Sequence, residues 1–394
     1  MEVIAVVILI VIILAVETLI FTKNMFKNFR YTATFSKGEV FEGENVELVE
    51  TVLNGKELPI PSLRAEITAS RWLEFSNTDS IQNEEIRFVP SFFMLKGYQK
   101  ITRRWDVACT RRGVHGVRSI ILISNDLLGL KTLSQPVYVN SNVVVLPTPV
   151  DLGKYFVNPR LMQGDFVVRR ALVEDPFFVS GVRQYAPTDS LKQIHWSATA
   201  KTGEIMVRNY DYTNKQNLTV VLNMQSRPSE RGKVGDINAL ETGIKVCTAL
   251  FEQAHSICIG VKFASNGSLS EDPKDKELVI TREYSSEEGT YELLRTLAYL
   301  KLRSTRDIYD LLHEIESQEL TSDICIVTCY INRYIEEFCE RMFRQNRTIV
   351  RVLVLDFDKG EQYGEYMEVY YLNEELREAA KAKAEAEAAE KEVG

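Results

Sequence analysis

The sequence lacks the short motifs that mark the commonest enzyme chemistries. It has no Gly-x-x-x-x-Gly-Lys-Ser/Thr run to hold nucleotide phosphates and no Gly-x-Ser-x-Gly elbow to expose a nucleophilic serine. It has only four histidines, and none of them lies in a pattern typical of a metal site: His115, His195, His255 and His313. These absences predict a protein that is not an enzyme and that carries no cofactor.

The chain also lacks an excess of positive charge. Lysine and arginine total 47 against 55 aspartates and glutamates, for a formal net charge of −8. A nucleic-acid-binding surface needs clustered lysines and arginines, so this balance argues against a nucleic-acid partner. With 45% hydrophobic and 26% charged residues, the 394-residue chain is typical of a globular protein and is long enough for two domains.

Cysteines are few and scattered, and several lie inside apolar runs. We interpret them as buried free thiols, which agrees with a reducing compartment. Cys325 and Cys329 are four residues apart, but no second Cys/His pair completes a tetrahedral zinc site. The six cysteines are Cys109, Cys247, Cys258, Cys325, Cys329 and Cys339.

Residues 3–21 form the one long apolar run and are interrupted only by Glu17 and Thr18. This is about the length that a helix needs to cross roughly 30 Å of hydrocarbon. A cleaved signal peptide is the alternative. Only Met1 and Glu2 precede the run, and no small-x-small cleavage pattern follows it, so the sequence favours a retained anchor over residues 1–22.

Basic residues follow the apolar run directly, at Lys23, Lys27 and Arg30. Positive charges beside a membrane span favour the cytoplasmic side. The sequence therefore predicts a single-pass protein of the cell membrane, with its soluble domains in the cytoplasm.

Short strands are predicted throughout residues 31–149, separated by Asn-Gly, Pro-rich and Arg-Gly turn signals. Four segments carry apolar residues at strand spacing: 45–52, 63–68, 120–123 and 143–146. Several short strands at this spacing predict a small antiparallel β-sandwich or barrel.

Strand and helix patterns alternate over residues 216–373. Strands are predicted at 218–222, 257–261, 324–327 and 349–355, and helices at 237–251, 293–302, 308–315 and 334–343. This alternation predicts a doubly wound α/β domain with a parallel sheet. Residues 374–394 are rich in Ala, Glu and Lys, which predicts a charged, solvated helical tail; a docking peptide is the alternative.

Residues 150–215 are predicted to connect the two domains, and they contain an unusual segment at 181–203. It matches the pattern Gly-x-Arg-x-Tyr-x-x-x-Asp-x-x-x-x-x-x-Trp-x-x-x-Ala-x-x-Gly and closely resembles the signature of the domain of unknown function 58 family. We refer to the following residues as the signature: Gly181, Arg183, Tyr185, Asp189, Lys192, His195, Trp196, Gly203 and Arg208. Arg111-Arg112-Gly113 and the segment 126–130 resemble further elements of the family, with Leu127 in place of a usual proline.

The resemblance implies that a von Willebrand factor A-like domain follows the signature. It also implies a link to MoxR-type AAA+ ATPases, and hence a scaffold or adaptor that assembles or regulates an envelope complex with other membrane proteins. The signature itself allows two interpretations. We favour a structural strap in which Tyr185 and Trp196 are buried and Arg183 pairs with Asp189; the alternative is a partner-facing surface.

A-like domains of this kind often bind a divalent cation through an Asp-x-Ser-x-Ser segment after the first strand, a later Thr and a second Asp. Here the corresponding residues are Asn223, Gln225, Arg227, Thr328 and Cys329. Two carboxylates are missing and a permanent cation is added, so we predict no metal at this degenerate site. The same edge of the sheet remains the expected ligand-facing surface. A metal-dependent, adhesion-type A-domain is the alternative function.

Overall fold

A computed structural model describes residues 2–372 apart from 77, 84, 127–128, 130, 153–173, 187–193, 213–216, 231, 233, 271, 273–275, 319–321, 347 and 356–362. The predicted tail at 374–394 lies outside the described residues. Unit 1 comprises Met1–Thr148 with Leu294–Leu300, and unit 2 comprises Pro149–Leu293 with Lys301–Gly394.

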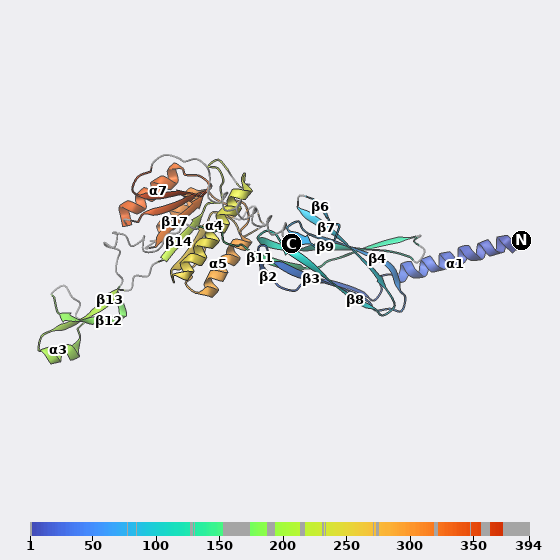
Figure 1. Cartoon of the computed structure of the whole chain (residues 1–394), viewed down its shortest axis with the longest axis horizontal. Helices are drawn as coiled ribbons and strands as arrows, with labels where there is room; N and C mark the ends of the chain where they lie inside the picture. The colour runs from blue at the N-terminus through green and yellow to red at the C-terminus, as the bar shows by residue number, and fades with distance from the viewer. Residues whose placement is uncertain are drawn as a thin grey trace, which may run out of the picture. The chain divides into compact units, whose positions relative to one another are not determined.

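Unit 1 begins with helix α1, Glu2–Asn24, which extends from one end of a β-sandwich (Figure 1). Its segment Val6–Asn24 has a mean hydropathy of 2.6 and is 6% buried, so it is long and apolar enough to cross a membrane. The predicted N-terminal apolar helix is therefore present. Its last turns belong to the sandwich, because Phe21 and Met25 are buried in the sandwich core.

Two sheets face each other in unit 1. The first has the order β1-β3-β8-β5, and the second has the order β2-β11-β9-β4-β7-β6 with β10 paired to β9. The strands are β1 Phe29–Phe35, β2 Glu39–Phe41, β3 Asn45–Asn54, β4 Ile60–Ser70, β5 Leu73–Phe75, β6 Ile81–Gln82, β7 Ile86–Leu95, β8 Lys100–Cys109, β9 Gly113–Asn125, β10 Thr132–Val137 and β11 Ser141–Leu146. All four predicted strand segments lie within these elements.

The core of unit 1 follows from strand alternation. On β3, every second residue faces inward, so Val46, Leu48 and Val52 are buried against residues of the opposite sheet such as Ile67 and Ile120. Gly113 and Gly129 have φ of +134° and +72°. Glycine adopts this backbone region without steric cost; Gly113 is the first residue of β9, and Gly129 lies in a bend.

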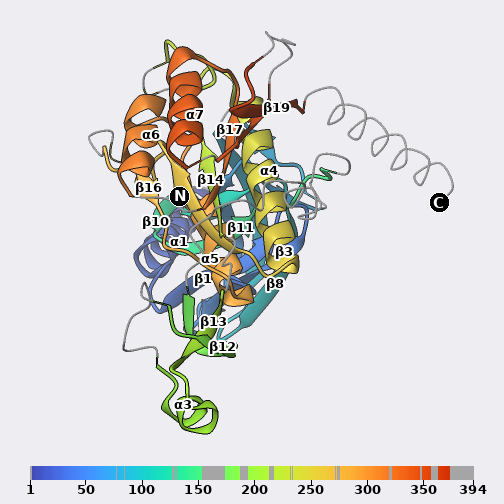
Figure 2. The same ribbon diagram turned by 90° about the vertical axis from the view of Figure 1, so that its left-hand side faces the viewer.

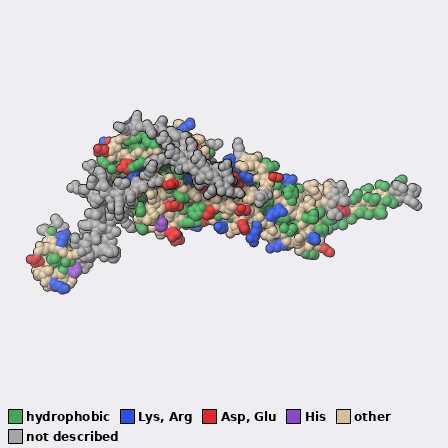
Figure 3. Space-filling view, in the orientation of Figure 1, with side chains coloured by type: hydrophobic (Ala, Val, Ile, Leu, Met, Phe, Trp, Pro, Cys, Tyr) green, Lys and Arg blue, Asp and Glu red, His purple; other side chains and the backbone are tan. Residues whose placement is uncertain are grey.

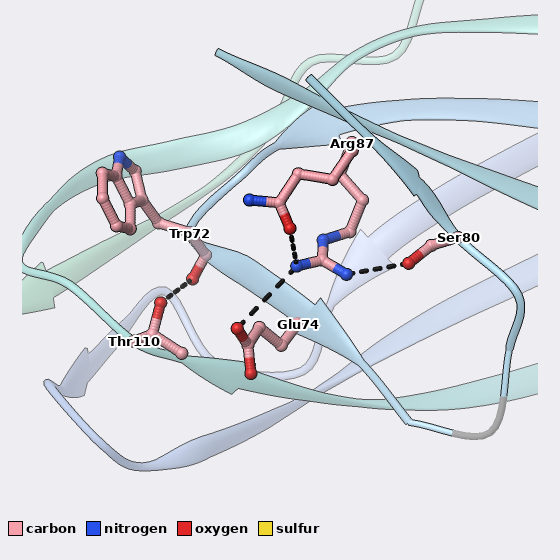
Figure 4. A network of polar contacts seen from close by, with 6 residues as sticks. Trp72, Glu74, Ser80, Arg87 and Thr110 are labelled. Atoms are coloured by element: carbon pink, nitrogen blue, oxygen red, sulfur yellow. Dashed lines mark hydrogen bonds and ion pairs between the residues drawn. The ribbon is translucent and has the colours of Figure 1, made fainter. Parts of the chain in front are cut away.

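Polar contacts also join the sheets at their edge (Figure 4). Arg87 on β7 donates from Nη1 to Ser80 Oγ at 2.8 Å, and its Nη2 lies 3.8 Å from Glu74 Oε1 on β5 of the other sheet. Nearby, Thr110 Oγ1 donates to the carbonyl oxygen of Trp72 at 3.1 Å. The edges of the sandwich are thus held by side chains as well as by the apolar core.

Unit 2 contains a six-stranded sheet in the order β16-β15-β14-β17-β18-β19, in which only β16 is antiparallel to its neighbour. Its strands are β14 Asn217–Leu222, β15 Gly260–Ser265, β16 Val279–Ile280, β17 Asp323–Thr328, β18 Val350–Val354 and β19 Met367–Tyr371. Its helices are α4 Ile237–Ser256, α6 Ile308–Ser317 and α7 Arg333–Asn346, together with the first part of α5, Glu287–Tyr299, whose residues from Leu294 onward belong to unit 1.

Helices cover both faces of this sheet (Figure 2). Helix α4 packs on one face, where a Cβ added to Gly243 would lie 3.3 Å from Leu222 Cδ1. Helices α6 and α7 pack on the other face, against Val221 and Ile326. Neighbouring residues of β14 therefore face opposite layers, which is why its sequence is apolar throughout.

The bounds of one strand predicted in unit 2 are wrong. The strand predicted at 257–261 is β15, Gly260–Ser265, because Ile257 caps α4 and Cys258 has a φ of +57°, which no strand accommodates. The connector predicted at 150–215 contains an antiparallel pair, β12 Glu174–Gln184 with β13 Met206–Tyr212, and helix α3 Trp196–Thr202. Its polar, mixed composition hid these elements.

Candidate functional site

The candidate site lies at the carboxyl edge of the six-stranded sheet, where β14 and β17 end side by side. The chain leaves β14 for β15 on one side, whereas β17 lies on the other side. Such a switch point leaves a crevice in doubly wound sheets, and ligands bind there. Asn223–Ser226 follow β14, Asn266 follows β15 and Thr328 ends β17.

Asn223 is the first residue after β14 and is fully buried. Its Nδ2 donates to Thr328 Oγ1 at 3.0 Å, and its Oδ1 accepts from Gln225 N and from Asn266 Nδ2, both at 3.1 Å. An amide oxygen has two lone pairs, so both are occupied. Asn223 thereby joins the ends of three neighbouring strands without any charge.

Gln225 is the second hub of this network and is 1% exposed. Its Nε2 donates to the Glu230 carbonyl at 2.8 Å and to Asp307 Oδ1 at 3.2 Å. Its Oε1 accepts from Ile308 N at 3.2 Å and from Tyr330 OH at 3.3 Å. The Gln225 amide therefore fixes the loop after β14 to the start of α6.

Tyr330 closes the network from the side of β17. Burial, followed by the charges of Asp307, Cys329 and Glu230, raises the pKa of the Tyr330 phenol, although its hydrogen bond with Asn223 opposes this. The phenol is therefore protonated near neutral pH and can act as the donor to Gln225.

The loop between β14 and α4 is braced by Glu230. Its carboxylate accepts from Ser226 Oγ at 2.5 Å, from Ser226 N at 2.8 Å and from Gly235 N at 2.9 Å. Partial burial is the largest single effect on the pKa of Glu230 and raises it, but these hydrogen bonds together hold the pKa below its usual value. Glu230 is thus an ionised brace and does not act as a proton donor at neutral pH.

A cavity of about 320 Å³ adjoins Gln225. Tyr309 and Tyr334 are about half exposed at its edge, with ring centroids 5.3 Å apart. The cavity is lined by Gln225, Pro228, Asp307, Ile308, Tyr309, Tyr330, Asn332 and Tyr334. Aromatic and amide groups of this kind are suited to holding a side chain, because they combine apolar area with hydrogen-bonding groups.

The structure brings together three of the five residues of the predicted degenerate site, namely Asn223, Gln225 and Thr328. Cys329 is buried beside them, whereas Arg227 is exposed and does not line the cavity. Within the described parts of the chain, no group of three or more His, Cys, Asp or Glu side chains is arranged to hold a metal ion.

Sequence reasoning missed Asn266, Asp307 and the cavity tyrosines. Asn266 was missed because the strand before it was placed too early in the chain. Asp307 directly precedes α6. An aspartate at the start of a predicted helix is typical of a helix cap, and this was the sequence signal that could have identified Asp307.

The described signature residues lie in or beside β12, β13 and α3, which we refer to as the signature module. His195 caps α3, where its Nδ1 accepts from Ala198 N at 3.1 Å, and Gly203 ends α3 with a φ of +76°. Arg183 is exposed on β12, and Gly181 pairs with Asn209 of β13. Arg208 lies on β13, while Asp189 and Lys192 fall outside the described residues.

The prediction that Trp196 is a buried anchor is wrong. Trp196 is the first residue of α3 and is 71% exposed, and Tyr185 is only half-buried. The apolar contact in this module comes instead from Ile194 and Val207, which are paired and buried. Helix α3 is only seven residues long and buries none of its residues, so it offers no apolar surface against which the Trp196 indole could pack.

Comparisons with known proteins agree with the signature. Residues 181–316 match the family model described as "Protein of unknown function DUF58", which supports the DUF58 family for this chain. The matched range covers most of the signature module and continues through β14, α4 and β15 into α6. The search of curated proteins gave no match.

Solved structures similar to parts of the chain include a non-cellulosomal cohesin from Archaeoglobus fulgidus, at 15% identity and a TM-score of 0.20, covering 30% of this chain and 91% of the cohesin. A cohesin in a cohesin–dockerin complex from Clostridium thermocellum has 11% identity and a TM-score of 0.21, covering 29% of this chain and 99% of that one. The sporulation control protein Spo0M from Bacillus subtilis has 13% identity and a TM-score of 0.17, covering 29% and 49%. At these scores the likenesses carry no functional argument.

Proposed function

We propose that this chain is a membrane-anchored adaptor without enzymatic activity, which holds a partner protein at the carboxyl edge of its α/β unit. The observation that carries the proposal is the hydrogen-bond network centred on the Asn223 and Gln225 amides, beside a tyrosine-lined cavity. Exposed tyrosines at the edge of a well-ordered pocket are frequent anchors of protein interfaces. The network would hold that pocket in a fixed shape and would limit the entropy lost on binding.

The strand order of the six-stranded sheet supports a von Willebrand factor A-like assignment for this unit, because a doubly wound sheet is the topology that the family resemblance implies. The same resemblance suggests the partner, a MoxR-type AAA+ ATPase, and a role in assembling or regulating an envelope complex. The metal-dependent alternative requires oxygen ligands that are free to face an ion. Asn223 Oδ1 instead accepts from Gln225 N and Asn266 Nδ2, and Thr328 Oγ1 accepts from Asn223 Nδ2 and donates to the Tyr330 carbonyl.

The partner is tested by purifying the full-length protein from native membranes with non-hydrolysable ATP and identifying what is bound. We expect an AAA+ ATPase. If none is retained, the proposed partner is wrong.

The docking surface is tested with Tyr309→Ala and Tyr334→Ala, which should release the ATPase. Tyr138→Ala is the matched control, because Tyr138 is an exposed tyrosine of unit 1. Charge reversal at Arg183 and Lys192 tests the signature surface separately. Retention in the tyrosine variants with release in the charge-reversed variant would place the partner on the signature and away from the cavity.

The orientation of the proposed anchor follows from Lys23 and Lys27, which are exposed at the end of α1. A C-terminal alkaline phosphatase fusion should be inactive and a C-terminal fluorescent protein should be bright. High phosphatase activity would mean that the soluble units lie outside the cytoplasm.

A further inference from the structure

One turn of α1 has two faces of opposite character. Leu19 and Ile20 are exposed, at 68% and 47%. On the other face of the same turn, Thr18 Oγ1 donates to Asp126 Oδ2 at 3.2 Å, and Asp126 is a buried residue of the sandwich. Exposed leucine and isoleucine on a membrane-spanning helix need lipid around them. The sandwich therefore reaches the depth at which α1 still faces lipid.

Three connections between strands gather around the end of α1: two pass from one sheet to the other, and the third joins the hairpin of β9 and β10. In the turn between β3 and β4, Gly55 N donates to the Asn28 carbonyl at 2.8 Å and Lys56 Nζ donates to the Met25 carbonyl at 2.6 Å. In the turn between β7 and β8, Tyr98 N donates to the Lys56 carbonyl at 3.0 Å. The turn between β9 and β10 begins at Asp126, which is bonded to Thr18.

These turns present positive charge and an exposed ring. Lys96, Tyr98 and Lys131 are exposed on the second and third turns. Lys23 and Lys27 are exposed at the end of α1, and among the described residues of the turns Glu57 is the exposed carboxylate. Figure 3 shows the green apolar surface of α1 and, on the part of unit 1 from which it extends, blue Lys and Arg side chains together with red Asp and Glu side chains. We refer to Lys23, Lys27, Lys96, Tyr98 and Lys131 as the basic rim.

We propose that the basic rim lies in the headgroup layer of the membrane that α1 crosses and binds anionic phospholipid headgroups there. Lysines at this depth attract anionic lipids, and tyrosines are enriched at the same level because their rings are amphipathic. The sandwich is then seated on the membrane without a linker, since Phe21 and Met25 are part of its core. This inference rests on the proposed membrane anchoring by α1.

The test uses the full-length protein in vesicles of phosphatidylcholine alone or mixed with phosphatidylglycerol. A fluorophore is attached at Tyr98→Cys and, as the matched control, at Tyr138→Cys. Both tyrosines are exposed, but Tyr138 follows β10 at its end away from α1. Both variants are made with Cys258→Ser, because Cys258 is the exposed native cysteine. Quenching by nitroxide-labelled lipid headgroups is then measured.

We expect quenching at position 98, greater with phosphatidylglycerol, and little quenching at position 138. Lys96→Glu with Lys131→Glu should remove the difference between the two lipid mixtures, whereas Lys37→Glu at the opposite end of β1 should preserve it. Equal quenching in both lipid mixtures would overturn the proposal, and so would equal quenching at both positions. Either result would also be expected if the basic rim binds another protein in place of lipid.

A failure of the anchoring is distinguished by carbonate extraction of the same vesicles. If the protein is extracted, α1 does not cross the membrane and the proposed anchoring fails. If the protein stays in the vesicles and position 98 is not quenched, the anchoring stands and the basic rim is wrong.

Discussion

Each unit buries a cluster of polar side chains, and the two clusters differ in charge and in their surroundings. In unit 1, Glu50 is fully buried, and its carboxylate accepts from Tyr31 OH at 2.5 Å, Ser91 Oγ at 2.7 Å and Trp105 Nε1 at 2.9 Å. In unit 2, the Asn223 and Gln225 amides make the corresponding network, which carries no charge on its hubs and adjoins a cavity.

The difference concerns what each cluster can do. The Glu50 carboxylate lies on β3 of one sheet and receives Ser91 from β7 of the other, so it joins the two sheets. Arg103 donates to the same Ser91 Oγ at 2.7 Å and stacks on Trp105. A buried carboxylate with these partners is a structural link, whereas neutral amides beside a cavity can hold a binding surface in shape at a lower desolvation cost.

Removing the buried charge of Glu50 in unit 1 should have the largest effect on stability. Glu50→Leu leaves the Tyr31, Ser91 and Trp105 donors buried without an acceptor, and should lower the free energy of unfolding by about 3–5 kcal/mol. Urea unfolding followed by tryptophan fluorescence measures this loss. Glu47→Leu is the control, because Glu47 is an exposed residue of the same strand and its replacement should change stability by roughly 0.5 kcal/mol or less. Similar losses in both variants would contradict the structural role of Glu50.

Disrupting the hub of unit 2 should have a smaller effect on stability and a larger one on binding. Gln225→Leu removes the acceptor of Ile308 N and Tyr330 OH, at a cost of about 1–3 kcal/mol, because the adjoining cavity admits water to some of the released groups. The same variant should lose the co-purified partner, while Glu50→Leu should retain it wherever it folds. A Gln225→Leu protein that unfolds as easily as Glu50→Leu would remove the distinction between the two clusters.

Alkaline pH should weaken the cluster of unit 1. Burial, followed by the charge of Glu50, raises the pKa of the Tyr31 phenol above its ordinary value. Folded protein therefore keeps a proton that the unfolded chain releases above a pH of about 10, so stability falls as the pH rises past that point. Tyr31→Phe lacks this proton, and the stability advantage of the unaltered protein over it should shrink between pH 9 and 11. A constant advantage would mean that Tyr31 titrates alike in both states.

The smallest effect is expected from divalent cations. Both lone pairs of Asn223 Oδ1 are occupied by protein donors. Millimolar magnesium or manganese should therefore leave the unfolding temperature unchanged, because an ion stabilises a protein only when it binds the folded state. A rise that depends on the metal concentration would show that other oxygen ligands replace the missing carboxylates, and would favour the metal-dependent alternative.

Parts of both clusters could be read from the sequence. The alternation of β3 puts Glu50 in phase with Val46, Leu48 and Val52, so its inward position follows from strand period alone. Asn223 and Gln225 were found because they follow an unmistakably apolar strand. Their partners were not found, since Ser91 is 41 residues from Glu50 and Thr328 is 105 residues from Asn223. Local patterns carry no information about pairing over such distances.

The basic rim and Trp196 are two further features that local sequence patterns did not predict correctly. The apolar run and its flanking lysines identified α1 as a candidate span, but only the packing of Phe21 and Met25 placed the sandwich against its last turns. The composition around Trp196 favoured a buried anchor, yet its module is too small to bury the indole.

By itself, the sequence determined the apolar N-terminal helix, the change from β to α/β patterning and the residues that end the central strands, because each of these depends on local periodicity and composition. The tertiary structure decided which strand ends meet, which side chains hydrogen-bond to one another, where the cavity opens and which turns of α1 pack against the sandwich. Those features arise from packing between segments far apart in the chain, where the free energy of burying a polar group depends on the partner that the fold brings to it.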